Sequence, residues 1–307
     1  YEKREGIFIQ RESTPSVVGT KTAQWVNLGR MKNQGFDMSL EFDHSFNKDF
    51  SISARGNFTY NRNKKLYDDK PDQIWKYQNL AGFANNQQFG LIAEGLFESE
   101  EDIANWPKQD FGTVRPGDIK YRDLDRSGFV DQNDVTKVGK SPYPEWTYSL
   151  GAAFNYRGFD FSFLLQGIAG ASFNLLDNAV QTRAFVDNGN VYPIARGAWA
   201  YYPEQGIDTR ATAIYPRLSL QDNSNNYRNS TLWKRSGDFL KLRNVELGYT
   251  FAQPSLSKAG ISKIRIYLSG VNLLTVSRLM RDYDIDPEIL SGHPALKSYN
   301  LGLTVTF

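Results

Sequence analysis

The chain has 307 residues, enough to bury a large core, and 14% of them are aromatic. The mean hydropathy is negative, so the apolar residues are diluted by polar ones, which is typical of β-structure with one wet face. The 36 basic and 34 acidic residues are well mixed and leave a formal net charge of +2, so nothing favours a nucleic-acid partner. Cysteine is absent, which excludes thiol catalysis and cysteine-ligated metal sites.

The apolar runs of the chain predict no membrane-spanning helix. The longest uncharged run, residues 161–176, is shorter than the roughly 20 residues that such a helix requires, and it contains Ser, Gln and Asn. The chain opens on YEKREGIFIQ, which reads as part of a strand and not as a signal peptide. We therefore expect the natural N-terminus to lie upstream.

The predicted elements begin with a strand at 1–11 and continue with a long hairpin. Residues 36–46 alternate strictly, and one face carries Phe36, Met38, Leu40, Phe42, His44 and Phe46. After a short turn at 47–48, residues 50–60 repeat the alternation. Only extended strands place such sets on opposite faces.

The same alternation recurs along the rest of the chain. Further strands are predicted at 146–156, 159–173, 238–251, 263–276 and 297–307, which brings the total to eight. At Arg243 the alternation shifts phase, which predicts a bulge. Short turns at 47–48 and 157–158 and a modest one at 252–262 alternate with long connections at 61–145, 174–237 and 277–296.

Two architectures fit alternating strands: a soluble β-sandwich and an outer-membrane barrel. Strands of about 11 residues exceed the usual length in globular sheets and match a tilted membrane-crossing strand. The polar faces carry Asp, Glu and Arg at mid-strand, as expected of a watery lumen. Aromatic residues stand at the short-turn ends, as in a membrane girdle: Phe46, Phe50, Tyr156, Phe159, Phe251 and Phe307. These features favour a transmembrane antiparallel β-barrel with short periplasmic turns and long extracellular loops.

The last strand reads SYNLGLTVTF and ends on a C-terminal Phe. Its apolar stripe consists of Tyr299, Leu301, Leu303, Val305 and Phe307. This pattern resembles the signal by which outer-membrane barrels are recognised for insertion. The alternative is an ordinary amphipathic strand that happens to finish the chain.

Several segments together resemble the C-terminal barrel of SusC/RagA-type TonB-dependent outer-membrane transporters. They include GRMKNQGFDMSLEF (29–42), FGLIAEGLFES (89–99), RPGDIKYRDLDRSGFVDQNDVTKVG (115–139), YPEWTYSLGAAFNYRGFDFSFLLQGIAG (143–170), YPRLSL (215–220), SGDFLKLRNVELGYTF (236–251) and IRIYLSGVNLLT (264–275). Their order and spacing, with the closing strand, cover almost the whole chain. The combination is specific, whereas any single segment would be weak.

The resemblance implies a 22-stranded barrel of which residues 1–307 would be the C-terminal portion. It also implies an N-terminal plug domain and a TonB box, both missing from this chain, and a SusD-like surface lipoprotein as partner. The expected function is TonB-dependent import of large nutrients such as oligosaccharides or peptides across the outer membrane. Eight strands alone would close into a barrel whose interior is filled by side chains.

The stretch DLDRSGFVDQND, residues 123–134, matches a calcium-binding loop of the EF-hand type, although no helical pattern flanks it. The predicted ligands are Asp123, Asp125, Ser127, the carbonyl of Phe129, Asp131 and Asp134, with Gly128 at the tight turn. Position twelve is Asp instead of Glu, which shortens the reach for bidentate binding. The sequence suggests a structural Ca²⁺ that stiffens a long extracellular loop; the alternative is an acidic turn held by its own hydrogen bonds.

Other candidate sites are weaker. Trp199, Tyr201 and Tyr202 could stack on cargo near the barrel mouth, although such rings more often pack a loop onto its neighbours. His44 and His293 are the only histidines and have no triad-type partners nearby, so no enzyme activity is predicted. The other function classes considered are a binding or scaffold barrel without transport and a calcium-stabilised secreted enzyme, which would have to be soluble.

Overall fold

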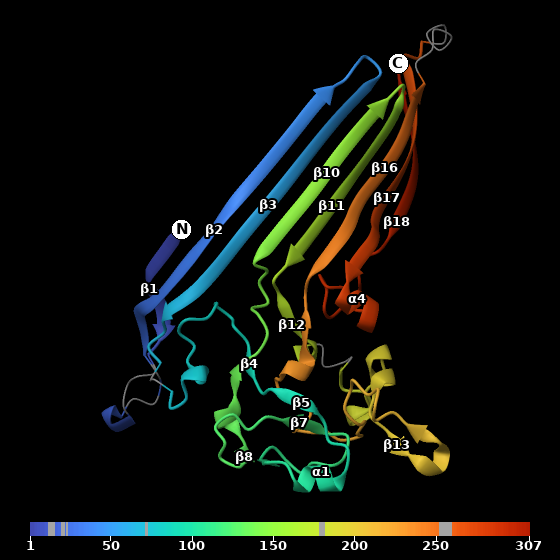
Figure 1. The fold of residues 1–307 in the computed structure, drawn as a ribbon. Helices are drawn as coiled ribbons and strands as arrows, with labels where there is room; N and C mark the ends of the chain where they lie inside the picture. Colours follow the sequence, from blue (N-terminus) through green and yellow to red (C-terminus); the bar gives the residue numbers. More distant parts are fainter. Residues whose placement is uncertain (12–15, 20–21, 23, 71–72, 178–181, 252–259) are drawn as a thin grey trace.

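The computed structural model describes all residues except 12–15, 20–21, 23, 71–72, 178–181 and 252–259, and its main feature is one curved antiparallel sheet (Figure 1). Across the sheet the strands are β1 (Glu2–Gln10), β2 (Trp25–Ser45), β3 (Phe50–Tyr67), β10 (Trp146–Tyr156), β11 (Phe159–Ala169), β16 (Phe239–Phe251), β17 (Lys263–Ser277) and β18 (Ser298–Thr306). Each strand pairs with its neighbours in chain order, and β1 and β18 form the two edges. The predicted all-β, antiparallel architecture is confirmed.

The remaining elements belong mostly to the long connections, which gather at the lower end of the sheet in Figure 1. The short strands are β4 (Phe89–Gly90), β5 (Ala93–Leu96), β6 (Lys108–Gln109), β7 (Ile119–Tyr121), β8 (Phe129–Val130), β9 (Thr136–Lys137), β12 (Ser172–Asn174), β13 (Tyr201–Tyr202), β14 (Ile207–Asp208) and β15 (Lys234–Ser236). The helices are α1 (Glu100–Ala104) and α4 (Arg278–Tyr283), with 3₁₀ turns η1 (Ser16–Val18), η2 (Lys76–Gln78), η3 (Gln132–Asp134), η4 (Leu175–Asp177), η5 (Val186–Asn188), η6 (Pro193–Gly197), η7 (Pro203–Gln205) and η8 (Thr231–Trp233). Within the described residues, no helix is both long and apolar enough to span a membrane.

The register of the sheet gathers the apolar side chains on one face. Leu40 lies opposite Gly56, which lies opposite Leu150, and Leu150 lies opposite Leu165. Two bands of rings bound this apolar face. The loop-side aromatic row is Phe36, Tyr60 and Trp146, and the turn-side aromatic row is Phe46, Phe50, Tyr156, Phe159 and Tyr249. Aromatic bands at both ends of an apolar stripe are typical of a strand-built membrane surface.

The opposite face of the sheet is polar, and its side chains bond to one another across the strands. Ser39 donates to the Asn57 side-chain oxygen at 3.0 Å, and the Asn57 amide donates to the Ser149 hydroxyl at 3.2 Å. Arg55 pairs with Glu41 at 3.0 Å. Cross-strand partners of this kind stabilise a wet face that contains no apolar core.

Strands β2 and β3 extend well beyond the predicted ranges 36–46 and 50–60. The added residues, 25–35 and 61–67, lie on the loop side of the aromatic row and do not alternate between apolar and polar. Above a membrane both faces of a strand meet water, so the period-two signal disappears while the hydrogen-bond ladder continues. The predicted lengths of these two strands were therefore wrong, although their positions were correct.

Two other predictions about strand geometry have opposite outcomes. The predicted strand 159–173 is wrong beyond Ala169, because Gly170 has a φ of +82° and turns the chain into β12, which pairs with β15 in a separate ribbon.

The predicted bulge at Arg243 is confirmed, since the register of β16 shifts there against both β11 and β17. The predicted turn at 252–262 falls largely outside the described residues.

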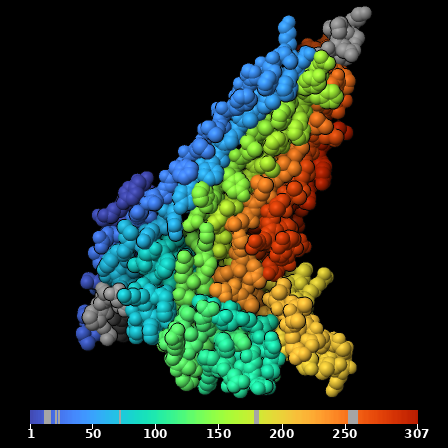
Figure 2. All heavy atoms as spheres, in the orientation of Figure 1, coloured from blue at the N-terminus to red at the C-terminus, as the bar shows by residue number. Residues whose placement is uncertain are grey.

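The hydrophobic core of the described residues lies in the connections between β3 and β10, β11 and β16, and β17 and β18, here called the loop cap. Its central members are Leu91, Phe111, Ile119, Tyr121, Val130, Leu175, Ile194, Tyr215, Trp233, Leu279, Tyr283 and Ile285. All three connections contribute to this core, so the loops fold together as one body. Figure 2 shows this body packed closely at one end of the sheet.

Candidate functional site

A buried polar network joins two connections of the loop cap. Asp118 is fully buried and accepts hydrogen bonds from Asn223 at 3.0 Å and Asn226 at 2.9 Å. The Nε of Arg217 lies 2.7 Å from the same carboxylate. A buried charge is tolerated only when it is paired and hydrogen-bonded, and here the partners come from more than 90 residues away. The network therefore fixes the relative position of the two longest loops.

The polar face of the sheet carries a second charged cluster, at its loop end. Lys241 is only 1% exposed, and its ammonium lies 2.8 Å from Asp286 and 2.6 Å from Glu288. Arg243, in the bulge, also pairs with Glu288 and donates to Gln166 at 2.9 Å. The cluster anchors the β17–β18 connection onto the polar face of β16.

The pKa values of the two acids in this cluster reflect their partners. Burial alone would raise the pKa of Asp286, but the hydrogen bonds from Lys241 and from the backbone N–H of Glu288 more than offset it, so the pKa lies below its usual value. Burial likewise raises the pKa of Glu288, whereas the hydrogen bonds from Arg243 and Lys241 lower it. The pKa of Glu288 therefore also lies below its usual value. Both acids are therefore stabilised as carboxylates.

The sequence pattern marks Arg243 but does not mark Lys241, Asp286 or Glu288 as members of a charged cluster. The available signal was the spacing FLKLRN, which puts two basic residues two positions apart in an otherwise apolar strand. Their acidic partners lie in an irregular connection, so no periodic pattern marks them.

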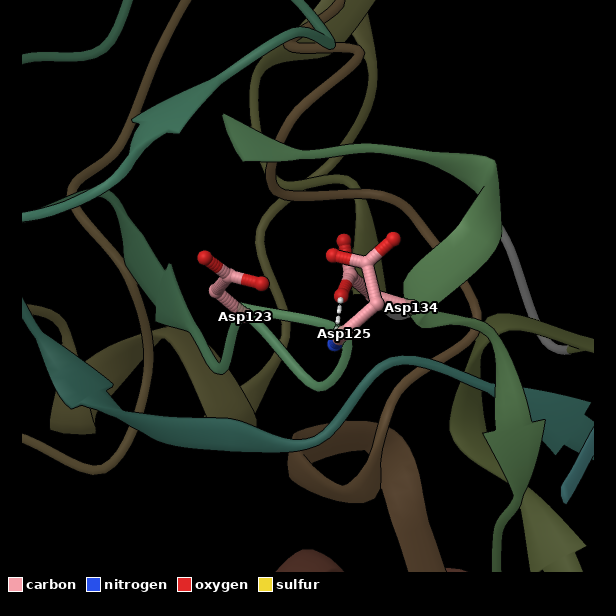
Figure 3. A group of neighbouring side chains, drawn as sticks. All are labelled: Asp123, Asp125 and Asp134. Atoms are coloured by element: carbon pink, nitrogen blue, oxygen red, sulfur yellow. Dashed lines mark hydrogen bonds between the residues drawn. The ribbon is translucent and has the colours of Figure 1, made fainter. Parts of the chain in front are cut away.

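The predicted cation loop brings three of its acidic residues together. Oxygen atoms of Asp123, Asp125 and Asp134 lie within 4.8 Å of one another. Figure 3 shows Asp125 and Asp134 side by side with Asp123 across the loop. Gly128 has a φ of +87°, the left-handed conformation expected at the tight turn.

The same loop is also tied by its own hydrogen bonds. Asp134 is buried and accepts from the backbone N–H of Leu124 at 2.6 Å and of Asp131 at 2.7 Å, which caps the 3₁₀ turn η3. Asp123 accepts from the backbone N–H groups of Ser127 and Gly128. The geometry thus fits both predicted alternatives, the cation site and the self-bonded acidic turn.

The other predicted ligands make local contacts. Asp131 accepts from the N–H of Asn133 at 2.6 Å, and the Ser127 hydroxyl donates to the carbonyl of Phe129 at 3.1 Å. The side chain of Phe129 is exposed, and the predicted ligand is its backbone carbonyl. Three of the six predicted ligands therefore converge as carboxylates, and the other three lie along the same turn.

The loop carries several carboxylates close together, and within the described part of the chain their negative charge is not balanced by an ion pair with a basic residue. Among the described residues, no lysine or arginine forms an ion pair with Asp123, Asp125, Asp131 or Asp134. Burial, with a contribution from Asp125, raises the pKa of Asp134. Burial and then these carboxylates raise the pKa of Tyr77, whose hydroxyl donates to the carbonyl of Asn133, to about 12. Hard oxygen ligands without a basic partner are what Ca²⁺ prefers.

The predicted aromatic contact residues fall into two groups. Trp199 is half-buried and packs on Gly117, where an added Cβ would lie 2.5 Å from the indole ring. Tyr201 and Tyr202 are exposed on β13, and the Arg210 guanidinium lies 3.7 Å from the ring centre of Tyr201. Trp199 therefore packs the loop, and the two tyrosines are presented at its surface.

The closing strand has the predicted face. Tyr299, Leu301, Leu303 and Phe307 are exposed and Val305 is half-buried, in register with the apolar residues of β17. The amphipathic stripe is thus present in the structure. A role of these residues in insertion stays a prediction.

Comparison with known proteins gives one consistent picture. The chain is similar to TonB-dependent receptor P3 of Formosa agariphila, with 24% identity over 93% of this chain, and to TonB-dependent receptor SusC of Bacteroides thetaiotaomicron, with 24% identity over 92%. Among solved structures it resembles the RagAB peptide transporter (TM-score 0.65, 20% identity, 99% of this chain) and the RagAB peptide importer in the open-open state (TM-score 0.66, 22% identity, 99% of this chain). No family model matches.

The chain spans 30% and 27% of the two curated relatives and 32% of each solved transporter chain. The resemblance to SusC/RagA-type TonB-dependent transporters, predicted from the sequence, is confirmed. The antiparallel sheet expected of this part of such a barrel and the outer-membrane location are confirmed with it. The names of the relatives describe receptors and transporters and not enzymes.

Proposed function

We propose that this chain, whose sheet matches the barrel of SusC/RagA-type TonB-dependent transporters, is the C-terminal part of an outer-membrane importer of large nutrients. The two-faced sheet carries the membrane part of the proposal, and the likeness to TonB-dependent receptors and solved transporter chains carries the import part. One face is apolar and bounded by the two aromatic rows, whereas the other holds the ion pairs Glu41–Arg55 and Lys241–Asp286. A surface of this kind separates lipid from a wet interior through which a solute can pass.

The remaining parts of such an importer would come from chain outside residues 1–307. The edges β1 and β18 offer unpaired backbone groups to further strands of a 22-stranded barrel. The plug domain and the TonB box would be supplied by an upstream region, through which TonB would act. A SusD-like lipoprotein would cover the extracellular side, where the loop cap presents Tyr201 and Tyr202.

The cargo class follows from the solved relatives only in part. The two solved structures are named as a peptide transporter and a peptide importer, which favours peptides. The resemblance found in the sequence implies oligosaccharides as a second cargo class. The exposed rings of Tyr201 and Tyr202 suit both, because they can stack on sugar rings or on peptide side chains.

An uptake assay in the source cell tests import. Loss of the complete gene, or of TonB, should abolish uptake of a fluorescent peptide mixture or of an oligosaccharide mixture, and re-expression of the complete protein should restore it. The negative control is the protein with Leu150→Arg, which carries a charge on the lipid face. It should fail to restore uptake because less of it inserts into the membrane.

The alternative is a binding or scaffold barrel without transport, and the two-faced sheet alone fits it equally well. Uptake of both mixtures that continues unchanged without the gene would favour this alternative. Surface binding of the same mixtures that survives loss of TonB would favour it as well.

For the acidic loop we propose a structural Ca²⁺ held by Asp123, Asp125 and Asp134, with Ser127, Phe129 and Asp131 completing the site. The ion would neutralise carboxylates that lack a basic partner and would stiffen the loop cap at β8 and η3. Chelation by EDTA should then increase protease cleavage within 100–145 and leave the sheet intact. The Asp134→Asn variant should be cleaved equally with and without EDTA. Cleavage of the parent protein that does not change with EDTA would leave the self-bonded turn as the correct description.

A further inference from the structure

The apolar face of the sheet continues, on the loop side of its aromatic row, into a row of basic residues. Lys3 of β1 lies opposite Lys32 of β2, and Lys32 lies opposite Lys64 of β3. One row closer to the rings, Gln34 lies opposite Arg62. Because directly paired residues share a face and alternate residues return to it, these side chains stand on the same face as Phe36 and Tyr60.

The height of this row relative to the membrane follows from strand geometry. The segment of β2 from Phe36 to Phe46 is about 33 Å long at about 3.3 Å per residue. With a tilt of about 40° it spans about 25 Å, the height of the apolar band of an outer-membrane barrel. Lys32 lies roughly 10 Å further along the membrane normal. The basic row therefore lies at the level of the outer-leaflet headgroups.

A groove borders this row. It has a volume of about 490 Å³ and is lined by Lys32, Arg62, Lys64, Lys137 and Lys140, with Glu145 as its one acidic residue. Glu145 pairs with Lys140 at 2.9 Å and with Arg62 at 3.5 Å. Among the residues that the structure describes, no other charged group lines the groove, so an excess of positive charge remains.

The basic row is unfavourable by itself. Like charges directly opposite each other in a sheet destabilise it, and the row places three lysines in succession. Lys3 is offset by Glu5 at 2.7 Å. Within the described part of the chain, Lys32 and Lys64 form no ion pair. An external anion at the groove would remove this repulsion.

We propose that this groove binds the phosphorylated headgroup of an outer-leaflet lipid, with Lys32, Arg62 and Lys64 contacting phosphate and the acyl chains lying on the apolar face beside Phe36 and Tyr60. Charge complementarity and continuity with the apolar face carry the assignment. Basic clusters at membrane interfaces recognise anionic headgroups in this way. The lipid would hold the loop cap at a fixed height above the membrane, a role separate from import.

Binding of purified lipid A to the complete protein in detergent, followed by native mass spectrometry, tests the proposal. The variant Lys32→Gln/Arg62→Gln/Lys64→Gln should bind at least tenfold more weakly than the parent protein. The control variant Lys76→Gln/Lys108→Gln/Lys297→Gln removes the same charge from other exposed positions and should bind as the parent does. Equal binding by the groove variant and the parent would overturn the proposal.

Two further arms use the parent protein, so they do not depend on the folding of a variant. Lipid A from which the phosphates have been removed should bind as weakly as lipid A binds to the groove variant. Inorganic phosphate at millimolar concentration should leave lipid A bound, since it makes no contact with the apolar face. Undiminished binding of the phosphate-free lipid, or displacement by inorganic phosphate, would contradict a lipid headgroup as the ligand.

Discussion

The sheet and the loop cap are stabilised in different ways, although they belong to one chain. In the sheet, apolar side chains such as Leu40 and Leu150 remain exposed, whereas in the loop cap Trp233 and Tyr121 are almost fully buried. The sheet therefore needs a lipid surround to cover its apolar face, while the loop cap carries its own core. The environment of each region, and not the composition of the chain, therefore decides which region needs a buried core.

The largest expected effect breaks the loop cap and leaves the sheet. Trp233→Ala removes a ring that packs on Tyr215 and Tyr227 and whose Nε1 donates to the carbonyl of Asn226 at 2.7 Å. We expect the free energy of unfolding of the loop cap to fall by about 3–5 kcal/mol. Hydrogen exchange should accelerate across the three connections and stay slow in β10 and β11. Acceleration in the sheet to the same extent would show that the two regions unfold together.

A somewhat smaller effect is expected where the two regions are joined. Lys241→Met leaves Asp286 and Glu288 without their shared cation and should cost about 3 kcal/mol, the lower end for breaking a buried pair, because Glu288 is half-exposed. Protease cleavage between β17 and β18 should increase. Lys263→Met, at the far end of the sheet, serves as the control and should not change this cleavage.

The same junction should respond to acid. Because the folded-state pKa values of Asp286 and Glu288 lie below their usual values, their contribution is complete above the usual pKa of about 4 and is lost as the pH falls through the lower folded-state values. Cleavage between β17 and β18 should therefore rise on acidification below pH 4. A cleavage rate that does not change with pH would contradict the assigned pairing.

A second substitution pair separates the two faces of the sheet. Leu150→Arg places a charge on the apolar face midway between Trp146 and Tyr156, and should destabilise the inserted sheet by about 2–4 kcal/mol. Ser149→Arg, one residue away on the polar face, should cost much less. Folding titrations from urea into lipid vesicles measure both values. Equal costs would mean that the two faces meet the same medium.

The smallest expected effect concerns the surface of the loop cap. Tyr202→Ala should change the free energy of unfolding by less than about 0.5 kcal/mol, because its ring is exposed on β13. If the ring contacts cargo, binding of peptides or oligosaccharides to the complete protein should weaken while stability stays the same. A large loss of stability would show that the ring packs the loop.

The sheet was predictable from the sequence because its period is local. The strict alternation in residues 36–46 and 50–60 predicts which side chains share a face, and the phase shift at Arg243 predicts the bulge. The extension of β2 to Trp25 was not predictable in this way, since both faces are wet there. Gly170 ends β11 through a positive φ, which an apolar run does not reveal.

The loop cap was much harder to predict, for a physical reason. Its core and its buried Asp118 depend on pairs such as Asp118 and Asn226 that lie far apart in the chain and follow no period. The acidic loop was the exception, because its ligand spacing is local, and Asp123, Asp125 and Asp134 do converge. The sequence did not distinguish Trp199, whose ring packs on Gly117, from the neighbouring rings of Tyr201 and Tyr202, which are exposed.

The apolar face of the sheet touches lipid and the opposite face touches water, and spin labels on both faces test this most directly. Residues 1–307 contain no cysteine, so in the complete protein, with any cysteine outside this range replaced, single spin labels can be placed at Met38→Cys, Leu40→Cys and Phe42→Cys and at Ser39→Cys and Glu41→Cys. In lipid vesicles, electron paramagnetic resonance should show labels at 38, 40 and 42 relaxed mainly by oxygen, and those at 39 and 41 mainly by a water-soluble nickel complex. Labels that show no alternation, or the opposite one, would contradict this assignment of the two faces.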